Sequence, residues 1–226
     1  MAFDLFEMQD QNVDGSGCGN RDAFIGNLAR FAPGRDVKIV AANSLDLWGM
    51  REQTGLHDLR FLSVDGGHTH DITLNDLKLA DATLNHDGLC VLDDILNAHW
   101  TGVISGTFAF LASTPGLVPC GLIPNKLVLC RTDRQEYWRS VLRAMLGHAL
   151  EQRDREFGGF TIDIFGSLPA AQLRGFGSYS RIHALETEVK ELREKLSAAM
   201  DSRENLYAST SWRLTAPMRR MKRWMG

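Results

Sequence analysis

The chain has 226 residues, of which 44% are hydrophobic and 23% are charged. It is therefore long enough for one domain with a sizeable core and an appendage. No apolar run approaches the roughly 20 residues that span a bilayer, and we expect no secretory signal at the N-terminus. The four cysteines show no CxxC spacing, which favours free thiols and a cytoplasmic location.

The net charge of −3 hides an asymmetry between the two ends of the chain. Residues 181–226 hold 10 Lys and Arg against 6 Asp and Glu, so the first 180 residues hold 15 against 22. An acidic body with a basic tail indicates two parts with different roles.

Short apolar segments alternate with helical patterns through about residue 165. We expect strands at residues 2–6, 37–42, 59–64 and 88–92, and helices at residues 22–31 and 71–84. Strands that alternate with helices are typical of a parallel α/β sheet.

The pattern then changes. Residues 117–123 and 126–131 are two apolar segments separated by Pro124-Asn125, which predicts an antiparallel pair. A helix is expected at residues 137–152 and a last strand at residues 160–165. The predicted fold is an α/β domain over residues 1–166, with a mostly parallel sheet that ends in antiparallel strands.

Three further segments are expected after this domain. Residues 167–180 contain Pro169, Gly175 and Gly177 and are typical of a linker. Residues 181–206 carry an apolar repeat with spacings of 3 and 4, which predicts a coiled-coil helix that joins two copies of the chain or a partner enzyme; its members are Ile182, Leu185, Val189, Leu192, Leu196 and Ala199. The alternative is a single amphipathic helix packed on the body.

The segment 207–226 is basic and amphipathic. From Ser209 onward it contains no acid, and five cations alternate with Trp, Leu and Met. This composition suits the surface of an anionic membrane at residues 209–226. RNA and a solvated end with no specific partner are the alternatives, and we do not expect a nucleic-acid partner.

Polar side chains follow four of the predicted strands, at the edge where an open parallel sheet binds its ligands. They are Asp4 after the first strand, Asn43 and Ser44 after the second, Asp65 and His68 after the third, and Asp93 and Asp94 after the fourth. Carboxylates held close together repel one another unless a cation intervenes, and a hard divalent ion with oxygen ligands relieves this.

Such an ion would also lower the pKa of a bound substrate hydroxyl, and His68 would then accept the proton. This is the chemistry of an oxygen-methylating enzyme. Each residue also has a simpler interpretation. Asp-Gly-Gly is a common turn sequence, Asp94 would cap the following helix, and His68 would be a surface residue.

Two motifs carry a resemblance to a known family. They are Phe61-Leu-Ser-Val-Asp-Gly-Gly-His-Thr-His-Asp with Asp76-Leu77, and Asp87-Gly-Leu-Cys-Val-Leu-Asp-Asp-Ile95. Together with Asp4-Leu-Phe, Gln11-Asn-Val-Asp-Gly-Ser-Gly and Asn125-Lys-Leu, they resemble the bacterial class I S-adenosylmethionine-dependent methyltransferases of the catechol and cephalosporin O-methyltransferase type. The resemblance covers about residues 1–166 and implies a Rossmann-like methyltransferase sheet.

The resemblance implies a role for each matching residue. Asp65, Asp93 and Asp94 would hold a divalent metal such as Mg²⁺, and His68 with Asp65 would be catalytic. Asp4 would bind the ribose hydroxyls of S-adenosylmethionine, Asn43 and Ser44 would lie beside its adenine, and Asp65 would also border the donor.

The chain departs from the family in one respect. The family begins with a strand and a Gly-rich loop that cradles the donor, whereas this chain is expected to start at the second strand. Residues 15–19 offer a G-x-G-x-G, but a nucleotide loop should follow its strand directly, so a surface loop is favoured. A catalytically inactive remnant that serves as a scaffold is therefore an alternative, and a nucleotide-binding oxidoreductase is a weaker one.

A second resemblance lies in the tail. Ser209-Thr-Ser-Trp-Arg-Leu-Thr-Ala-Pro-Met218 resembles the C-terminal segment of many bacterial glycosyltransferases and methyltransferases of surface-polysaccharide assembly. This implies a sugar or glycan hydroxyl as the methyl acceptor. It also implies a location at the inner face of the membrane.

Overall fold

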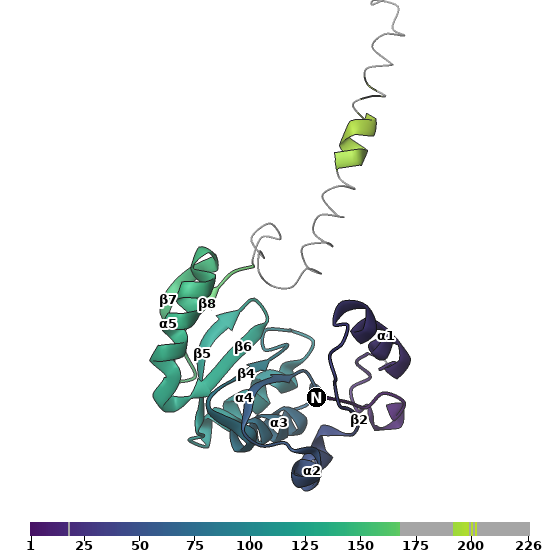
Figure 1. The fold of residues 1–226 in the computed structure, drawn as a ribbon. Coiled ribbons are helices and arrows are strands. Elements are labelled where there is room, and N and C mark those ends of the chain that lie inside the picture. The colour runs from purple at the N-terminus through teal and green to yellow at the C-terminus, as the bar shows by residue number, and fades with distance from the viewer. Residues whose placement is uncertain (18, 168–191, 199, 201, 203–226) are drawn as a thin grey trace, which may run out of the picture. The chain divides into compact units, whose positions relative to one another are not determined.

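The computed structural model describes residues 1–17, 19–167, 192–198, 200 and 202 (Figure 1). Met1–Ser167 form one compact unit. Within the described part of the chain, every helix is too short or too polar to cross a membrane.

The main sheet has six strands and a mixed topology. Its order is β3 (Leu59–Val64), β4 (Leu84–Leu92), β6 (Lys126–Arg131), β5 (Leu117–Ile123), β8 (Phe160–Phe165) and β7 (Leu150–Phe157). β3, β4, β5 and β8 run in one direction, while β6 and β7 run in the opposite one. The domain is thus Rossmann-like in general, and the predicted antiparallel pair β5–β6 is confirmed.

A second, smaller sheet consists of β1 (Ala2–Asp4) and β2 (Ile39–Ala41), which pair in parallel. It shares no strand pairing with the six-stranded sheet. Side chains connect the two instead, because Phe3, Val40 and Leu59 pack against one buried cluster. The cluster consists of Ala42, Leu47, Leu56 and Leu79.

Five α-helices accompany the strands within residues 1–167. They are α1 (Arg21–Phe31), α2 (Leu47–Thr54), α3 (His70–Thr83), α4 (Thr101–Ala112) and α5 (Gln135–Leu146). Short 3-10 turns occur at Gln9–Gln11, Ser44–Asp46, Thr132–Arg134 and Gly147–Ala149. The helical pattern predicted α1 and α3 to within one residue at each end, but it missed α2 and α4.

Glycines let α3 and α4 approach closely. A Cβ at Gly106 would lie 2.6 Å from the carbonyl oxygen of His70, and a Cβ at Gly102 would overlap the carbonyl oxygen of His68. Any larger residue would therefore separate the two helices or displace the turn before α3. The core between these helices and the sheet includes the wholly buried Leu77, Phe110 and Leu127.

The helix that was predicted at residues 137–152 is too long. α5 ends at Leu146, and Leu150–Phe157 form β7, an edge strand paired with β8. Most side chains of β7 are exposed, so its charged residues do not oppose strand formation. Gly158 and Gly159 both have positive φ, of 59° and 85°, and provide the tight turn between the two strands.

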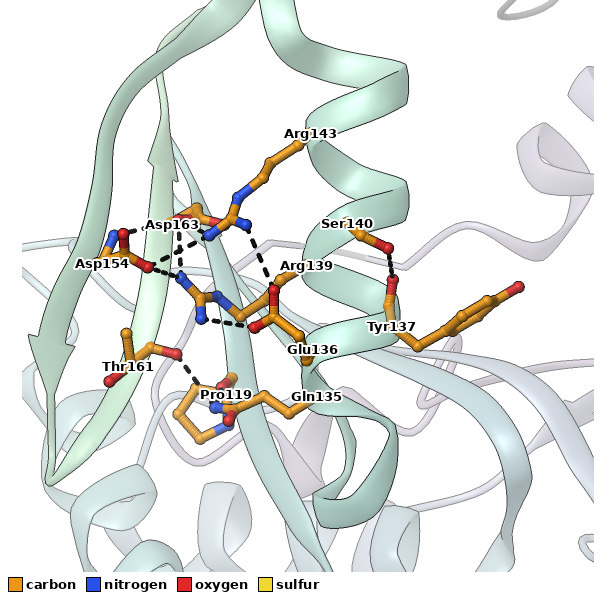
Figure 2. Close-up of polar contacts among 10 residues, drawn as sticks. All are labelled: Pro119, Gln135, Glu136, Tyr137, Arg139, Ser140, Arg143, Asp154, Thr161 and Asp163. Carbon is orange, nitrogen blue, oxygen red and sulfur yellow. Dashed lines mark hydrogen bonds and ion pairs between the residues drawn. The ribbon is translucent and has the colours of Figure 1, made fainter.

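A buried ionic network fastens α5 to this hairpin (Figure 2). Asp163 of β8 is fully buried and accepts from Arg139 Nη2 at 3.1 Å and Arg143 Nη2 at 3.0 Å. Asp154 of β7 and Glu136 of α5 complete the charge balance. Burial alone would raise the pKa of Asp163, but hydrogen bonds from the two arginines outweigh it and lower that pKa.

Most of the sequence after the α/β domain is not described. Residues 192–198 are helical and exposed, and Leu192 and Leu196 are 56% and 61% exposed. The expected linker from residue 168, the rest of the expected coiled coil and the basic tail lie outside the described residues. In the domain itself, Cys90, Cys120 and Cys130 are free and buried, as expected for structural thiols.

Candidate functional site

One cavity of about 560 Å³ lies where β1, β2 and β3 end. It is lined by side chains that are far apart in the sequence, because the ends of β1 and β2 in the smaller sheet and of β3 in the main sheet border the same cavity. Six of the seven predicted site residues line it: Asp4, Asn43, Ser44, Asp65, His68 and Asp94. Asp93 does not.

Local hydrogen bonds explain how these side chains are presented. Asp4 Oδ1 accepts from the backbone N–H of Phe6 at 2.7 Å, which turns the chain sharply after β1. Asn43 Oδ1 accepts from the backbone N–H of Leu45 at 3.1 Å and starts the 3-10 turn after β2. Asn43 also donates to Gln11 Oε1 at 3.2 Å, so the loops after β1 and β2 are joined at the cavity.

The Gly-rich loop forms part of the cavity wall. Ser16, Gly17 and Gly19 line the cavity, and Gly15 and Gly17 have φ near +66° and +67°, which favours glycine. The loop is largely exposed, as predicted, but its contact with the cavity was not. Ten residues, including a 3-10 turn, separate it from the end of β1, which argues against a dinucleotide-binding loop.

His68 is held between two carboxylates. Its Nδ1 lies 3.0 Å from Asp14 Oδ2, and its Nε2 lies 3.0 Å from Asp94 Oδ2. The ring of Trp100 stacks on the imidazole with centroids 4.4 Å apart. His68 is therefore a mostly buried residue with fixed orientation, and the interpretation as a free surface residue is wrong.

Asp14 was not among the predicted site residues. Burial opposes its ionisation, but hydrogen bonds from the His68 backbone N–H and from Ser16 hold its pKa well below the ordinary value. The only signal in the sequence was its position in the Gln11–Gly17 stretch that carries the family resemblance. That stretch alone could not show which residue faces His68.

Asp93 and Asp94 have different surroundings although they are adjacent. Asp94 has a left-handed backbone with φ of 59°, and its Oδ1 accepts from Asn125 at 2.6 Å and Asn97 at 3.1 Å. Burial opposes the ionisation of Asp94, but these hydrogen bonds and His68 lower its pKa. Asp93 instead forms an ion pair with Lys126 and does not line the large cavity.

The donors that lie together for a metal are Asp65, His68 and Asp94, whose ligand atoms are all within 4.8 Å of one another. The expected set was Asp65, Asp93 and Asp94, and this cluster of described residues contains two of them together with His68. Burial and the nearby Asp93 and Asp94 carboxylates raise the pKa of Asp65. A divalent cation would relieve this repulsion, and two carboxylates with one imidazole fit such an ion.

Asp76 lies beneath the turn that carries Asp65. It is buried, with 6% of its surface exposed, and burial raises its pKa to about 6 although hydrogen bonds from Asn75 and Ser44 lower it. Its Oδ2 lies 2.7 Å from the position of a Cβ on Gly66. Asn75 also donates to the Ser44 carbonyl at 3.2 Å, so this part of α3 supports the loops on both sides of the cavity.

The comparisons with protein-family models and with curated proteins give no relative for this chain. A function is therefore inferred from the cavity, its carboxylates and the orientation of His68.

Proposed function

We propose that this protein is a class I S-adenosylmethionine-dependent O-methyltransferase that acts on a sugar or glycan hydroxyl in bacterial surface-polysaccharide synthesis. The observation that carries the proposal is the single cavity that contains Asp4, Asn43, Ser44, Asp65 and His68. The sequence predicts these residues for one reaction, and they follow three different strands, β1, β2 and β3.

The cavity suits a nucleoside-containing donor. Its volume of about 560 Å³ is within the common range for small-molecule sites. Asp4 would accept hydrogen bonds from the ribose hydroxyls, and Asn43 and Ser44 would lie beside the adenine. The carboxylates of Asp65 and Asp94 would attract the positively charged sulfonium.

His68 would act as the general base through Nε2, which lies 3.0 Å from Asp94 Oδ2. The acceptor oxygen would bond to the methyl carbon while the carbon–sulfur bond breaks, and that bond's electron pair would pass to sulfur. The hydroxyl proton would go to His68. A divalent cation held by Asp65 and Asp94 would lower the pKa of the acceptor hydroxyl; if His68 were a third ligand, it would no longer be free as the base.

One observation favours the second candidate, a catalytically inactive methyltransferase-like remnant that serves as a scaffold. β1 and β2 form a sheet of their own, and no described strand joins them to β3. The family has its first strand and Gly-rich loop at that position. The cavity would then lack one wall, and the segments after residue 181 would carry the scaffold function.

We further propose that residues 182–206 join two copies of the chain or a partner enzyme. Residues 209–226 would bring the otherwise cytoplasmic protein to the inner face of the membrane. The basic and aromatic composition of the tail supports this second role. Deletion of residues 209–226 should abolish sedimentation with vesicles that contain anionic lipid. Unchanged sedimentation of the shortened chain would contradict the proposal.

The first test is calorimetric titration of the full chain with S-adenosylmethionine, with and without Mg²⁺. We expect micromolar affinity, and Asp4→Asn should weaken it because the ribose hydroxyls lose an ionised acceptor. Asp36→Asn changes an exposed acid outside the cavity and is the matched control. Absence of binding by a folded sample would exclude the enzyme and favour the scaffold.

A further inference from the structure

We propose that the cavity excludes phosphate-bearing ligands, so that the methyl acceptor is an unphosphorylated saccharide, such as the end of a glycan chain, and not a nucleotide sugar. That the saccharide is a methyl acceptor rests on the proposed function. The exclusion of phosphate depends only on the charges and hydrogen bonds of the cavity wall.

The charges on the cavity wall are negative. Asp4, Asp65 and Asp94 line it, and carboxylates are ionised at neutral pH. Proteins commonly hold phosphate with arginine or lysine side chains, but among the described residues neither type lines this cavity. The imidazole of His68 already lies 3.0 Å from a carboxylate on each side. A phosphate group would therefore be repelled by three carboxylates.

Carboxylates of the chain also occupy backbone N–H groups at the cavity. Such N–H groups, in loops and at helix N-termini, are a second means of holding phosphate. Ser16, His68 and Asp94 line the cavity. The N–H groups of Ser16 and His68 donate to the two oxygens of Asp14, at 2.9 and 2.5 Å. The Asp94 N–H donates to Asp93 Oδ1 at 2.8 Å, so a phosphate would have to displace all three bonds.

The Gly-rich loop is ordered by its own side chains. The Gly15 N–H donates to Asn12 Oδ1 at 3.1 Å, and the Asn12 amide donates to the Ser16 carbonyl at 3.0 Å. The Asp14 side chain is only 8% exposed, so a dissolved anion has little access to the bonds that it accepts. The loop therefore differs from a phosphate-binding loop, whose free N–H groups surround the anion.

A neutral polyol suits the same wall. Asp4 and Asp65 are exposed, and an ionised carboxylate accepts the hydrogen bonds that sugar hydroxyls donate. Asn43 and Ser44 add uncharged polar groups to the lining. A divalent cation held by Asp65 and Asp94 would offset two negative charges but would leave Asp4 and the occupied N–H groups unchanged. Specificity of this kind comes from repulsion of the wrong ligand as well as from attraction of the right one.

The test is a titration of the ¹⁵N-labelled full chain in EDTA, followed at the backbone amide signals of Ser16 and His68. The probes are inorganic pyrophosphate, adenosine and AMP, because adenosine and AMP differ only in the phosphate group. Pyrophosphate should cause no saturable shift of these two signals below roughly 10 mM. AMP should bind at least about tenfold more weakly than adenosine. Pyrophosphate bound elsewhere on the chain would leave both signals in place.

Asp14→Ala removes one charge and frees the N–H groups of Ser16 and His68. Pyrophosphate should therefore bind this variant at least about tenfold more tightly than the wild type. Asp10→Ala removes an exposed acid four residues away and should behave as the wild type. A folded Asp14→Ala protein that rejects pyrophosphate as the wild type does would refute the role of the occupied N–H groups.

Two wild-type results would overturn the exclusion of phosphate: a saturable shift with pyrophosphate below that concentration, or equal affinity for AMP and adenosine. Neither needs a variant, so a folding defect in Asp14→Ala cannot obscure them. Failure of the proposed function looks different, since S-adenosylmethionine and adenosine would then both leave the two signals unchanged. Pyrophosphate alone would still decide whether the cavity excludes phosphate. If methyl transfer to a saccharide is detected, a KM for its 1-phosphate equal to that for the free saccharide would overturn the choice of acceptor.

Discussion

Arg139 and Asp163 form a buried ion pair that joins α5 to β8, with 3.1 Å between Nη2 and Oδ1. Asp163 is completely buried, and the Arg139 side chain is 7% exposed. Arg143 Nε lies 2.7 Å from Asp163 Oδ2, so two guanidinium groups share one carboxylate (Figure 2). This pair secures the β7–β8 edge of the sheet, far along the strand order from β3 and the cavity.

Asp163→Asn should destabilise the domain by about 3–5 kcal/mol, because it leaves two arginines without their buried counter-charge. The pKa of Asp163 is lowered in the folded protein. The ionised carboxylate therefore contributes its full stabilisation above the unfolded pKa of about 3.9, and this stabilisation is lost as the pH falls through the folded pKa. Urea unfolding of Asp163→Asn and the control Asp36→Asn measures this. Equal stability of the two variants at neutral pH would contradict it.

Asp76 should have the opposite pH dependence. Its folded pKa of about 6 exceeds the unfolded value, so the folded state binds more protons and stability falls as the pH rises from about 4 to 6. The difference in pKa corresponds to on the order of 3 kcal/mol. Asp76→Asn cannot ionise and should be less sensitive to pH in this window. If the free energy of unfolding depends on pH in the same way in wild type and variant, burial does not raise the pKa of Asp76.

Gly106→Ala should destabilise the domain by about 1–3 kcal/mol, because the new methyl group would overlap the backbone of α3. Gly49→Ala in α2 is the matched control, since a Cβ there meets nothing within 4 Å. That substitution should stabilise by about 0.5–1 kcal/mol through the higher helix propensity of Ala. Thermal unfolding compares the Tm values of the two variants. A Tm for Gly106→Ala that rises as it does for Gly49→Ala would contradict the close contact between α3 and α4.

His68→Ala should lower the turnover of the proposed methyl transfer by roughly 10²–10⁴-fold, the usual contribution of a general base. His57→Ala replaces an exposed histidine that does not line the cavity and should retain activity. The measurement is steady-state transfer of a labelled methyl group to a sugar acceptor. Unchanged turnover in His68→Ala would remove this residue from the mechanism.

Mg²⁺ binding should distinguish the two adjacent aspartates. Asp94→Asn should weaken Mg²⁺ binding by at least about tenfold, because the Asp94 carboxylate lies close to the donor atoms of Asp65 and His68. Asp93→Asn should have a smaller effect, since the Asp93 carboxylate is paired with Lys126. Calorimetry with Mg²⁺ compares the variants. A greater loss of Mg²⁺ affinity in Asp93→Asn would favour the ligand set that the sequence predicts, with Asp93 as a ligand.

The sequence by itself determined most of the sheet. The strands Leu59–Val64, Leu117–Ile123, Lys126–Arg131 and Phe160–Phe165 have the predicted bounds, because each is a short apolar run between turn residues. It also indicated six residues that line one cavity, on the expectation that polar residues after parallel strands share an edge, although β1 and β2 form a separate sheet. Both inferences need only local pattern and the direction of the strands.

The tertiary structure alone decided which of these side chains contact one another. The backbone of Asp94 has positive φ, so Asp94 turns to His68 while Asp93 faces Lys126, and no local pattern distinguishes two consecutive aspartates. Asp14 reaches His68 across 54 positions of the chain. β7 replaces the end of a predicted helix because β8 offers it a partner strand. Contacts between distant segments depend on packing, and packing is not visible in the periodicity of the sequence.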